Sequence, residues 1–242
     1  KVAISATSLD RLLGDPYQFY AKEILRLSRL DALSADPFDD PALRGTLVHA
    51  ILEAWHGERA ARPDLPLVPF AKARLEREAV HPLFRGLWQP RILEALAWFE
   101  QRIAQDSAEG REIVAWEAKG STNVSGVEVR GRADRIDRMP DGTLAIIDYK
   151  TGTPPSAKQV EKGFALQMGV LGLIARDGEF TIGDRLIHGE ASRFEYWSLG
   201  RDSGRGKDGT PAFGYVVQPM KTEGKRSGLL PENFLPHHED RL

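Results

Sequence analysis

The 242-residue sequence contains no cysteine, which excludes disulfide bonds, iron–sulfur clusters and zinc sites built on thiolates. It also lacks an excess of charge of either sign. With a formal net charge of −2, any contact with nucleic acid must come from a local basic patch. No apolar run approaches the ~20 residues of a membrane-spanning helix, and the first residues lack the pattern of a signal peptide. We therefore expect a cytoplasmic protein without a membrane partner.

What remains is the composition of an ordinary globular protein. Hydrophobic residues make up 41% of the chain and charged residues 28%, and the length is enough for one large domain or two small ones. Because the chain begins at Lys1 rather than at methionine, we expect it to be a segment of a larger polypeptide.

Residues 1–106 carry the apolar periodicity of helices. The clearest helix is predicted over residues 43–55, where an apolar stripe recurs at helical spacing and His49 lies on a different face. A second long helix is expected at about residues 90–106. We therefore predict that 1–106 is an N-terminal helical section that carries His49.

After residue 106 the period changes to the alternation of strands. A helix is expected over residues 156–176, inside a core that we place at residues 107–199. The glycine-rich and poorly patterned residues 200–242 are expected to form a mobile tail. This order predicts an α/β (α+β) fold, in which helices flank a mixed central sheet with an antiparallel meander. Its strands are expected at residues 112–119, 127–138, 143–150 and 192–199.

Two of these strands carry acidic residues near their ends. Asp148 and Lys150 are two positions apart on one strand, so they face the same side of the sheet, and Asp134 lies on the preceding strand. Two carboxylates placed opposite each other are unfavourable unless a cation lies between them. Carboxylate oxygens suit Mg²⁺ or Mn²⁺, and a neighbouring amine can orient a water and offset phosphate charge. The pattern therefore favours a metal site for phosphodiester hydrolysis.

The turn between the strands decides whether Asp134 and Asp148 meet. If residues 140–142 form a three-residue loop, Met139 faces Thr143 and Asp134 lies opposite Asp148. A two-residue loop would shift the register and place the two aspartates on opposite faces. We predict the three-residue loop.

A structural interpretation of the same residues stays open. Asp134 and Asp148 can be solvated strand-end charges that pair with Arg135 and Lys150. Asp137 faces away from Asp134 by alternation and is expected to be structural, paired with a neighbouring arginine.

Five segments of the chain resemble, in the same order, the motifs of RecB-like nucleases in the PD-(D/E)XK superfamily. The likeness is strongest to nuclease domains of the AddB type, and it extends over about residues 4–199. The family has a restriction-endonuclease-like core, which the resemblance implies here. The matching segments are SATSL (5–9) with DPYQFY (15–20), GTLVH (45–49), GRADRID (131–137), IDYKTG (147–152) and QM (167–168).

The resemblance implies roles for particular residues. As catalytic residues it implies Asp134, Asp148, Lys150 and Gln167. As ligands of Mg²⁺ or Mn²⁺ it implies His49, Asp134, Asp148, the backbone carbonyl of Tyr149 and the acidic Glu117. Many AddB relatives have a cluster-binding cysteine where Asp15 stands, and without any cysteine this chain holds no iron–sulfur cluster.

Basic residues crowd the strand that carries Asp134. Arg130, Arg132 and Arg135, with Lys158 from the following helix, are expected to bind the phosphate backbone of DNA. The alternative is a solvated surface of alternating charge.

The implied function is that of a metal-dependent exonuclease domain in a helicase–nuclease complex for double-strand break repair. Its partners would be single- or double-stranded DNA ends and an AddA-like helicase subunit, since the chain has no ATPase loop of its own. Two alternatives stay open. One is a non-catalytic DNA-binding or scaffold module on a nuclease fold, and the other is a stand-alone exonuclease of the phage or CRISPR type.

Overall fold

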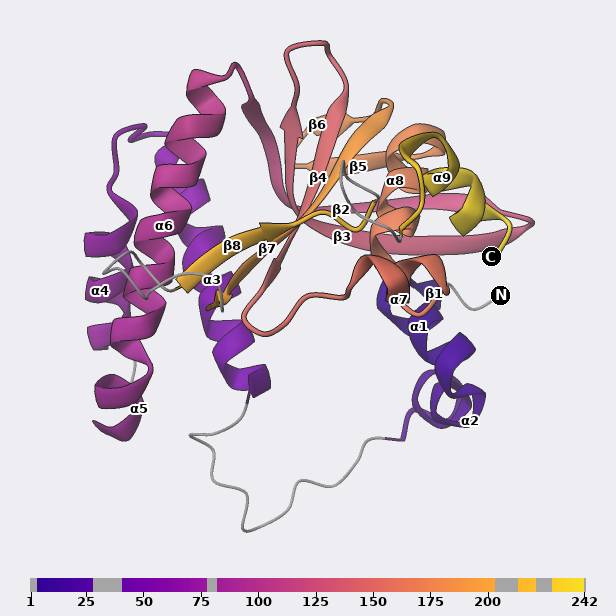
Figure 1. Ribbon diagram of the computed structural model, residues 1–242, viewed down its shortest axis with the longest axis horizontal. Coiled ribbons are helices and arrows are strands. Elements are labelled where there is room, and N and C mark those ends of the chain that lie inside the picture. The colour runs from indigo at the N-terminus through magenta and orange to yellow at the C-terminus, as the bar shows by residue number, and fades with distance from the viewer. Residues whose placement is uncertain (1–3, 28–40, 78–81, 203–212, 221–227, 242) are drawn as a thin grey trace.

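The computed structural model describes residues 4–27, 41–77, 82–202, 213–220 and 228–241 (Figure 1). Its strands are β1 (Ile4–Ser5), β2 (Glu112–Val124), β3 (Val127–Arg138), β4 (Leu144–Lys150), β5 (Glu179–Ile182), β6 (Arg185–Ile187), β7 (Ala191–Arg201) and β8 (Phe213–Val217). Its helices are α1 (Ala6–Gly14), α2 (Pro16–Phe19) with a π-helical turn (Tyr20–Ile24), α3 (Pro41–Arg59), α4 (Leu67–Arg77), α5 (Pro82–Leu87), α6 (Gln89–Ala108), α7 (Ala157–Glu161), α8 (Gln167–Asp177) and α9 (Pro231–Glu239).

The strands form one mixed sheet, which confirms the predicted fold class. Its order is β6-β5-β2-β3-β4-β7-β8, and β1 pairs with β3 beyond this path. The β2–β3–β4 meander is antiparallel, whereas β4 pairs in parallel with β7 and β1 with β3. None of the described helices has both the length and the apolar character that a bilayer crossing requires.

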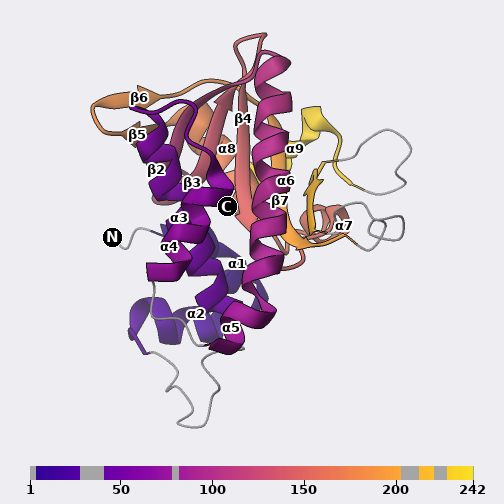
Figure 2. The ribbon, with the colours of Figure 1, turned by 90° about the vertical axis from the view of Figure 1, so that its left-hand side faces the viewer.

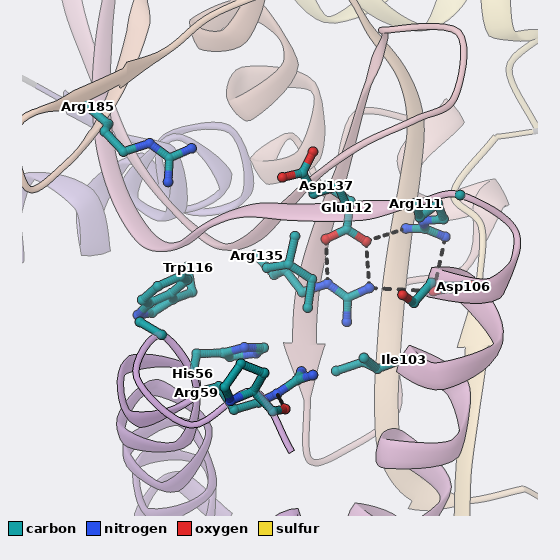
Figure 3. Close-up of a pocket in the computed structure, with 15 residues that line it drawn as sticks. His56, Arg59, Ile103, Asp106, Arg111, Glu112, Trp116, Arg135, Asp137 and Arg185 are labelled. Carbon is teal, nitrogen blue, oxygen red and sulfur yellow. Dashed lines mark hydrogen bonds and ion pairs between the residues drawn. The ribbon is translucent and has the colours of Figure 1, made fainter. Parts of the chain in front are cut away.

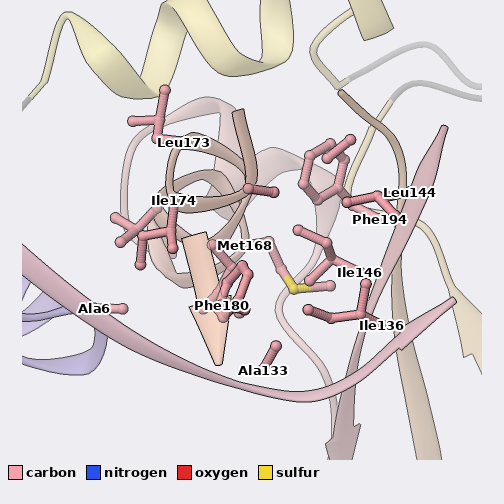
Figure 4. Close-up of a cluster of buried hydrophobic side chains, with 14 of the residues drawn as sticks. Ala6, Ala133, Ile136, Leu144, Ile146, Met168, Leu173, Ile174, Phe180 and Phe194 are labelled. Atoms are coloured by element: carbon pink, nitrogen blue, oxygen red, sulfur yellow. The ribbon is translucent and has the colours of Figure 1, made fainter. Parts of the chain in front are cut away.

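Helices cover both faces of this sheet (Figures 1 and 2). Helices α3, α4 and α6 bury one cluster of side chains against it, and α1, α8 and α9 bury the other, part of which Figure 4 shows. Central strand β4 explains the arrangement: Ala145, Ile147 and Tyr149 join the first cluster, whereas Ile146 joins the second. A strand buried on both faces reads as a continuous apolar run, as 144–147 does.

The β3–β4 hairpin has the predicted register. Arg135 pairs with Ile147, and the amide of Met139 donates to the carbonyl of Thr143 at 2.8 Å. The loop is therefore residues 140–142, and Gly142 takes the left-handed conformation (φ +85°) that such a loop requires. The same register places Asp134 across from Asp148.

Two sequence predictions about helices and the tail are wrong. Residues 156–176 are not one helix, because α7 ends at Glu161 and α8 begins at Gln167. Residues 213–217 and 231–239 are not a mobile tail: β8 pairs with β7, and α9 buries Phe234 and Leu235 in the core. The expectation for residues 203–212 and 221–227 lies outside the described part of the chain.

Candidate active site

Strands β3 and β4 deliver two buried aspartates to one place. The backbone amide of Tyr149 donates to Asp134 Oδ2 at 2.7 Å, which fixes this carboxylate against the neighbouring strand. Asp148 accepts from Gln167 Nε2 at 2.7 Å through Oδ1, and its Oδ2 lies 2.7 Å from Lys150 Nζ. Lys150 also donates to Gln167 Oε1 at 3.2 Å. The amine is thus held in a fixed position by two side chains.

Gln167 is positioned by the elements around it. It is the first residue of α8, and the preceding amide, of Leu166, donates to Asp10 Oδ1 at 2.6 Å. Asp10 belongs to α1, so this contact ties the N-terminal segment to the start of α8. The contact joins residues 156 positions apart in the chain.

His49 and Glu117 complete the group from the other side. His49 Nε2 lies 3.1 Å from the carbonyl oxygen of Tyr149 and donates to it. In the neutral imidazole, Nδ1 then carries a lone pair, and it faces Asp134 Oδ1 at 3.5 Å and Glu117 Oε1 at 3.7 Å. Nδ1 is buried and has no hydrogen-bond partner. Acceptors that face one another in this way are unfavourable unless a proton or a metal ion lies between them.

The donor set fits a divalent metal. Among the described residues, His49, Glu117 and Asp134 each offer a ligand atom, and these atoms lie within 4.8 Å of one another. Carboxylate oxygens and an imidazole nitrogen are both ligands that divalent metal ions accept in proteins. The carbonyl oxygen of Tyr149 lies next to these three residues, because it accepts a hydrogen bond from His49. The oxygens of Asp148, by contrast, contact Gln167 and Lys150.

Glu117 has an unusual backbone. Its φ of +48° is rare for a residue other than glycine, and it occurs inside β2, between the pairs Trp116–Arg135 and Ala118–Ala133. This conformation carries strain, which is typical of functional sites. The side chain of Glu117 also meets Arg132, whose Nε lies 2.9 Å from Oε2. The strand is thus distorted at the residue that joins the acidic cluster.

Burial changes the protonation of this cluster. Burial and then the charge of Asp148 raise the pKa of Asp134 to about 7. Burial also raises the pKa of Asp148, although Lys150 opposes the shift. Burial alone would lower the pKa of His49, but Glu117 and Asp134 outweigh it and raise that pKa. Without a metal, the cluster therefore holds protons more tightly than the same groups do in water.

This protonation predicts a pH-dependent stability difference between the wild type and Asp134→Asn. The folded pKa of Asp134 lies above its ordinary value of 3.8, so its stabilising contribution is complete below pH 4 and is lost as the pH rises to about 7. At pH 8 without metal, the free energy of unfolding of the variant should exceed that of the wild type by a few kcal/mol. Each unit of pKa shift corresponds to about 1.4 kcal/mol. Excess Mg²⁺ should instead make the wild type more stable than Asp134→Asn.

The measurement is urea unfolding of both proteins at pH 5 and pH 8 in EDTA. Burial lowers the pKa of His56 to about 3 and of His238 to about 4, so these two residues favour the folded state as the pH rises. They are common to both proteins and cancel in the difference. A stability difference that stays the same at pH 5 and pH 8 would contradict the prediction.

The acidic cluster opens into a cavity of about 510 Å³ that carries basic side chains. Arg130 and Arg132, both expected to bind DNA, line it, and so does Lys119. Lys158 is exposed on α7 and does not line the cavity. Ser5 and Thr7 line it as well, and the sequence signalled them only as part of the SATSL motif.

Arg135 is not available to DNA, and its predicted role is wrong. Its side chain is fully buried on the opposite face of the sheet, with its guanidinium 4.2 Å from the Trp197 ring centroid. It donates to both oxygens of Asp137 at 2.7 and 2.6 Å, so the structural pairing expected for Asp137 is confirmed. Arg111 and Asp106 extend this network, which Figure 3 shows beside a second cavity. The reason is alternation: positions 134 and 135 of one strand face opposite sides.

Comparisons with known proteins agree with this architecture. An uncharacterized protein of Rickettsia bellii is 26% identical over 192 residues, which cover 74% of this chain and 22% of that protein. One from Rickettsia typhi, RT0391, is 27% identical over 214 residues, or 83% of this chain and 24% of that protein. The chain thus spans about a quarter of the length of these relatives.

A solved structure and a family profile extend the comparison. The crystal structure of a "Putative exonuclease" from Eubacterium rectale has a TM-score of 0.50 and 14% identity, and covers 98% of this chain and 77% of that one. At this identity the likeness supports the fold alone. Residues 3–228, most of the chain, match the sequence model of one nuclease group. With its mixed sheet and its paired aspartates beside Lys150, the chain belongs to the PD-(D/E)XK nuclease superfamily.

Proposed function

We propose that the chain is a metal-dependent DNA exonuclease domain that hydrolyses phosphodiester bonds with Mg²⁺ or Mn²⁺. The observation that carries this proposal is the convergence of His49, Glu117 and Asp134 on one point, with Lys150 next to Asp148. Without a metal ion, these buried groups compensate one another only by holding protons, as the raised pKa values of Asp134 and His49 indicate. The nuclease superfamily supplies the reaction class.

The proposal assigns the steps of hydrolysis to a bound metal ion and to particular side chains. A bound divalent ion would polarise the phosphodiester and lower the pKa of a water. Lys150, held by Asp148 and Gln167, orients the attacking water and offsets the charge that develops on phosphate. The water oxygen bonds to phosphorus and loses a proton, while the bond from phosphorus to the 3′ oxygen breaks and that oxygen takes up a proton from solvent. A 5′-phosphate and a 3′-hydroxyl result.

The proposed setting is a larger helicase–nuclease of the AddB type that processes double-strand breaks together with an AddA-like helicase subunit. Two observations support it. The sequence motifs resemble those of AddB-type nuclease domains. The curated relatives are also about four times as long as the matched segment, which leaves room for further domains.

The proposal is tested with end-labelled linear DNA, single-stranded and duplex, incubated with the purified chain in Mg²⁺, in Mn²⁺ or in EDTA. We expect cleavage from the end with either metal and none in EDTA. Asp148→Asn should reduce the rate by about 10²-fold or more, because Lys150 loses its charged partner. Asp64→Asn, at an exposed position, is the matched control. Equal rates for the two variants, or a chain that binds Mn²⁺ and cuts neither substrate, would overturn the proposal.

A further inference from the structure

A second cavity lies on the face of the sheet opposite the acidic cluster, and Figure 3 shows residues of its lining. Its volume is about 580 Å³, and it is bounded by the end of α3, the end of α6, the start of β2 and Arg185 of β6. We call it the Arg135 cavity. Among the described residues, none lines both this cavity and the active-site cavity. Small-molecule sites in proteins usually occupy about 300–1,000 Å³, so a small ligand fits this space.

Two buried arginines that line the Arg135 cavity have unused hydrogen-bond donors. Arg135 donates to Asp137 through Nε and Nη2, but its Nη1 is buried and has no hydrogen-bond partner in the described part of the chain. Nε of Arg111 is a second buried donor without such a partner. Burial and then the charges of Arg135 and Arg59 lower the pKa of His56 to about 3, so this imidazole is neutral. Buried positive charge with unused donors attracts an anion.

Two more accessible arginines line the same cavity. Arg185 is exposed and Arg59 is half-buried, and within the described residues neither pairs with a carboxylate. Arg59 donates through Nε to the carbonyl oxygen of Pro63 at 3.0 Å, and its guanidinium lies 4.7 Å from the centroid of the Trp55 ring. The terminal nitrogens of Arg59 and Arg185 can therefore donate to the oxygens of a bound anion.

The acids of the Arg135 cavity do not cancel this positive charge. Asp106 and Asp137 line it, but each is already paired with buried arginines. Glu112 is the remaining acid of the described lining, and it is exposed. Four arginines thus line the cavity with three acids, an excess of one positive charge, although the formal net charge of the chain is −2.

Trp116 gives the Arg135 cavity a flat apolar wall. Its ring is half-buried and stacks on the neutral His56, with the ring centroids 5.9 Å apart and an angle of 21° between the planes. Ile103 and Ile113 add apolar surface to the lining. Planar rings stack well on an indole. The cavity therefore combines guanidinium donors with a surface that suits a planar ring.

We propose that the Arg135 cavity binds a small phosphorylated molecule that carries a planar ring, which is the chemistry of a nucleotide. Arg59 and Arg185 donate to the phosphate, the charge of Arg135 attracts it, and the ring lies against Trp116. A phosphate suits the cavity better than a carboxylate does, because its additional oxygens can accept from more than one guanidinium. The site is separate from the cleaved bond, since Arg135 and Asp134 face opposite sides of β3.

Isothermal titration calorimetry in EDTA tests this proposal with adenosine 5′-monophosphate (AMP), inorganic phosphate and adenosine as separate probes. We expect AMP to bind more tightly than phosphate or adenosine, because AMP alone has both the phosphate and the ring. Arg59→Gln and Arg185→Gln should each weaken AMP binding about 10- to 100-fold, the usual effect of losing one hydrogen bond from a charged group. Trp116→Leu should weaken AMP binding about 5- to 100-fold and change phosphate binding less than threefold.

Arg130→Gln is the matched control, because Arg130 is exposed and lines the active-site cavity rather than the Arg135 cavity. Its affinity for AMP should stay within about threefold of the wild-type value. Urea unfolding checks that each variant folds. Arg185→Gln carries the test if the other variants do not fold, since Arg185 is exposed on the short strand β6.

The outcomes do not depend on whether the chain cleaves DNA. Weaker AMP binding by either arginine variant, with Arg130→Gln unchanged, would support the site. No AMP binding by the wild type, wild-type affinity in both arginine variants, or an equal loss in Arg130→Gln would overturn it. AMP that bound no more tightly than phosphate would overturn the contact with Trp116. Displacement of AMP by a 5′-phosphorylated oligothymidylate would assign the phosphate to a strand end and overturn the small ligand.

Discussion

Lys150→Ala is expected to reduce DNA cleavage by about 10²- to 10⁴-fold while Mn²⁺ binding persists. The amine of Lys150 lies 2.7 Å from Asp148 Oδ2 and 3.2 Å from Gln167 Oε1, and both contacts hold it beside the acidic cluster. Alanine removes the only group of this trio that can carry positive charge toward phosphate. The three donor atoms of His49, Glu117 and Asp134 do not involve Lys150.

The measurement combines single-turnover cleavage of linear DNA with Mn²⁺ binding by electron paramagnetic resonance. Lys150→Arg retains the charge but not the compact amine, and we expect only partial recovery. Lys72→Ala, at an exposed position of α4, is the matched control. If Lys150→Ala cut DNA within about threefold of the wild type, the assignment of Lys150 would fail.

Arg135→Ala is expected to have the largest effect on stability, about 3–5 kcal/mol in the free energy of unfolding. Arg135 is fully buried and makes two short bonds to Asp137, and it also lies 3.5 Å from Asp106. Its removal leaves Asp137 dependent on Arg111, which is already shared with Asp106 and Glu195. Burying charge without full compensation is among the largest effects that a single substitution produces.

Urea unfolding of the variant checks this expectation. Arg138→Ala is the matched control: it is exposed on the same strand, and its stability should stay within about 0.5 kcal/mol of the wild type. An Arg135→Ala protein that unfolds at the wild-type urea concentration but binds DNA more weakly would restore the DNA-binding role that the structure contradicts.

The hairpin shows how much of the site was predictable from sequence. The turn chemistry of residues 140–142 and the alternation on either side of it were enough to predict the register that brings Asp134 across from Asp148. Local rules suffice there because the two strands are joined by three residues. His49 and Gln167 required the family resemblance, since no local pattern brings α3 or α8 to the same end of the sheet.

The failures have a common physical origin. Arg135 was predicted to bind DNA because it shares a strand with Arg130 and Arg132. Alternation along that strand, however, places its side chain on the other face of the sheet from Asp134. Strand β8 is five residues long and forms through pairing with β7, and α9 contains Pro236 and depends on the burial of Phe234. Such segments are stabilised by tertiary contacts, which a local pattern does not reveal.

The backbone of Glu117 was equally hidden. Glu117 lies within β2, and its left-handed backbone leaves no trace in the residue order.

Tyr149 ties His49 to the hydrophobic interior. Its carbonyl oxygen accepts from His49, while its hydroxyl lies 3.3 Å from Nε2 of His56, two helical turns farther along α3. Sliding α3 along β4 would break both contacts at once. The geometry of the proposed metal site thus depends on the packing of α3 on β4, and a substitution beneath α3 is expected to alter metal affinity without changing a ligand.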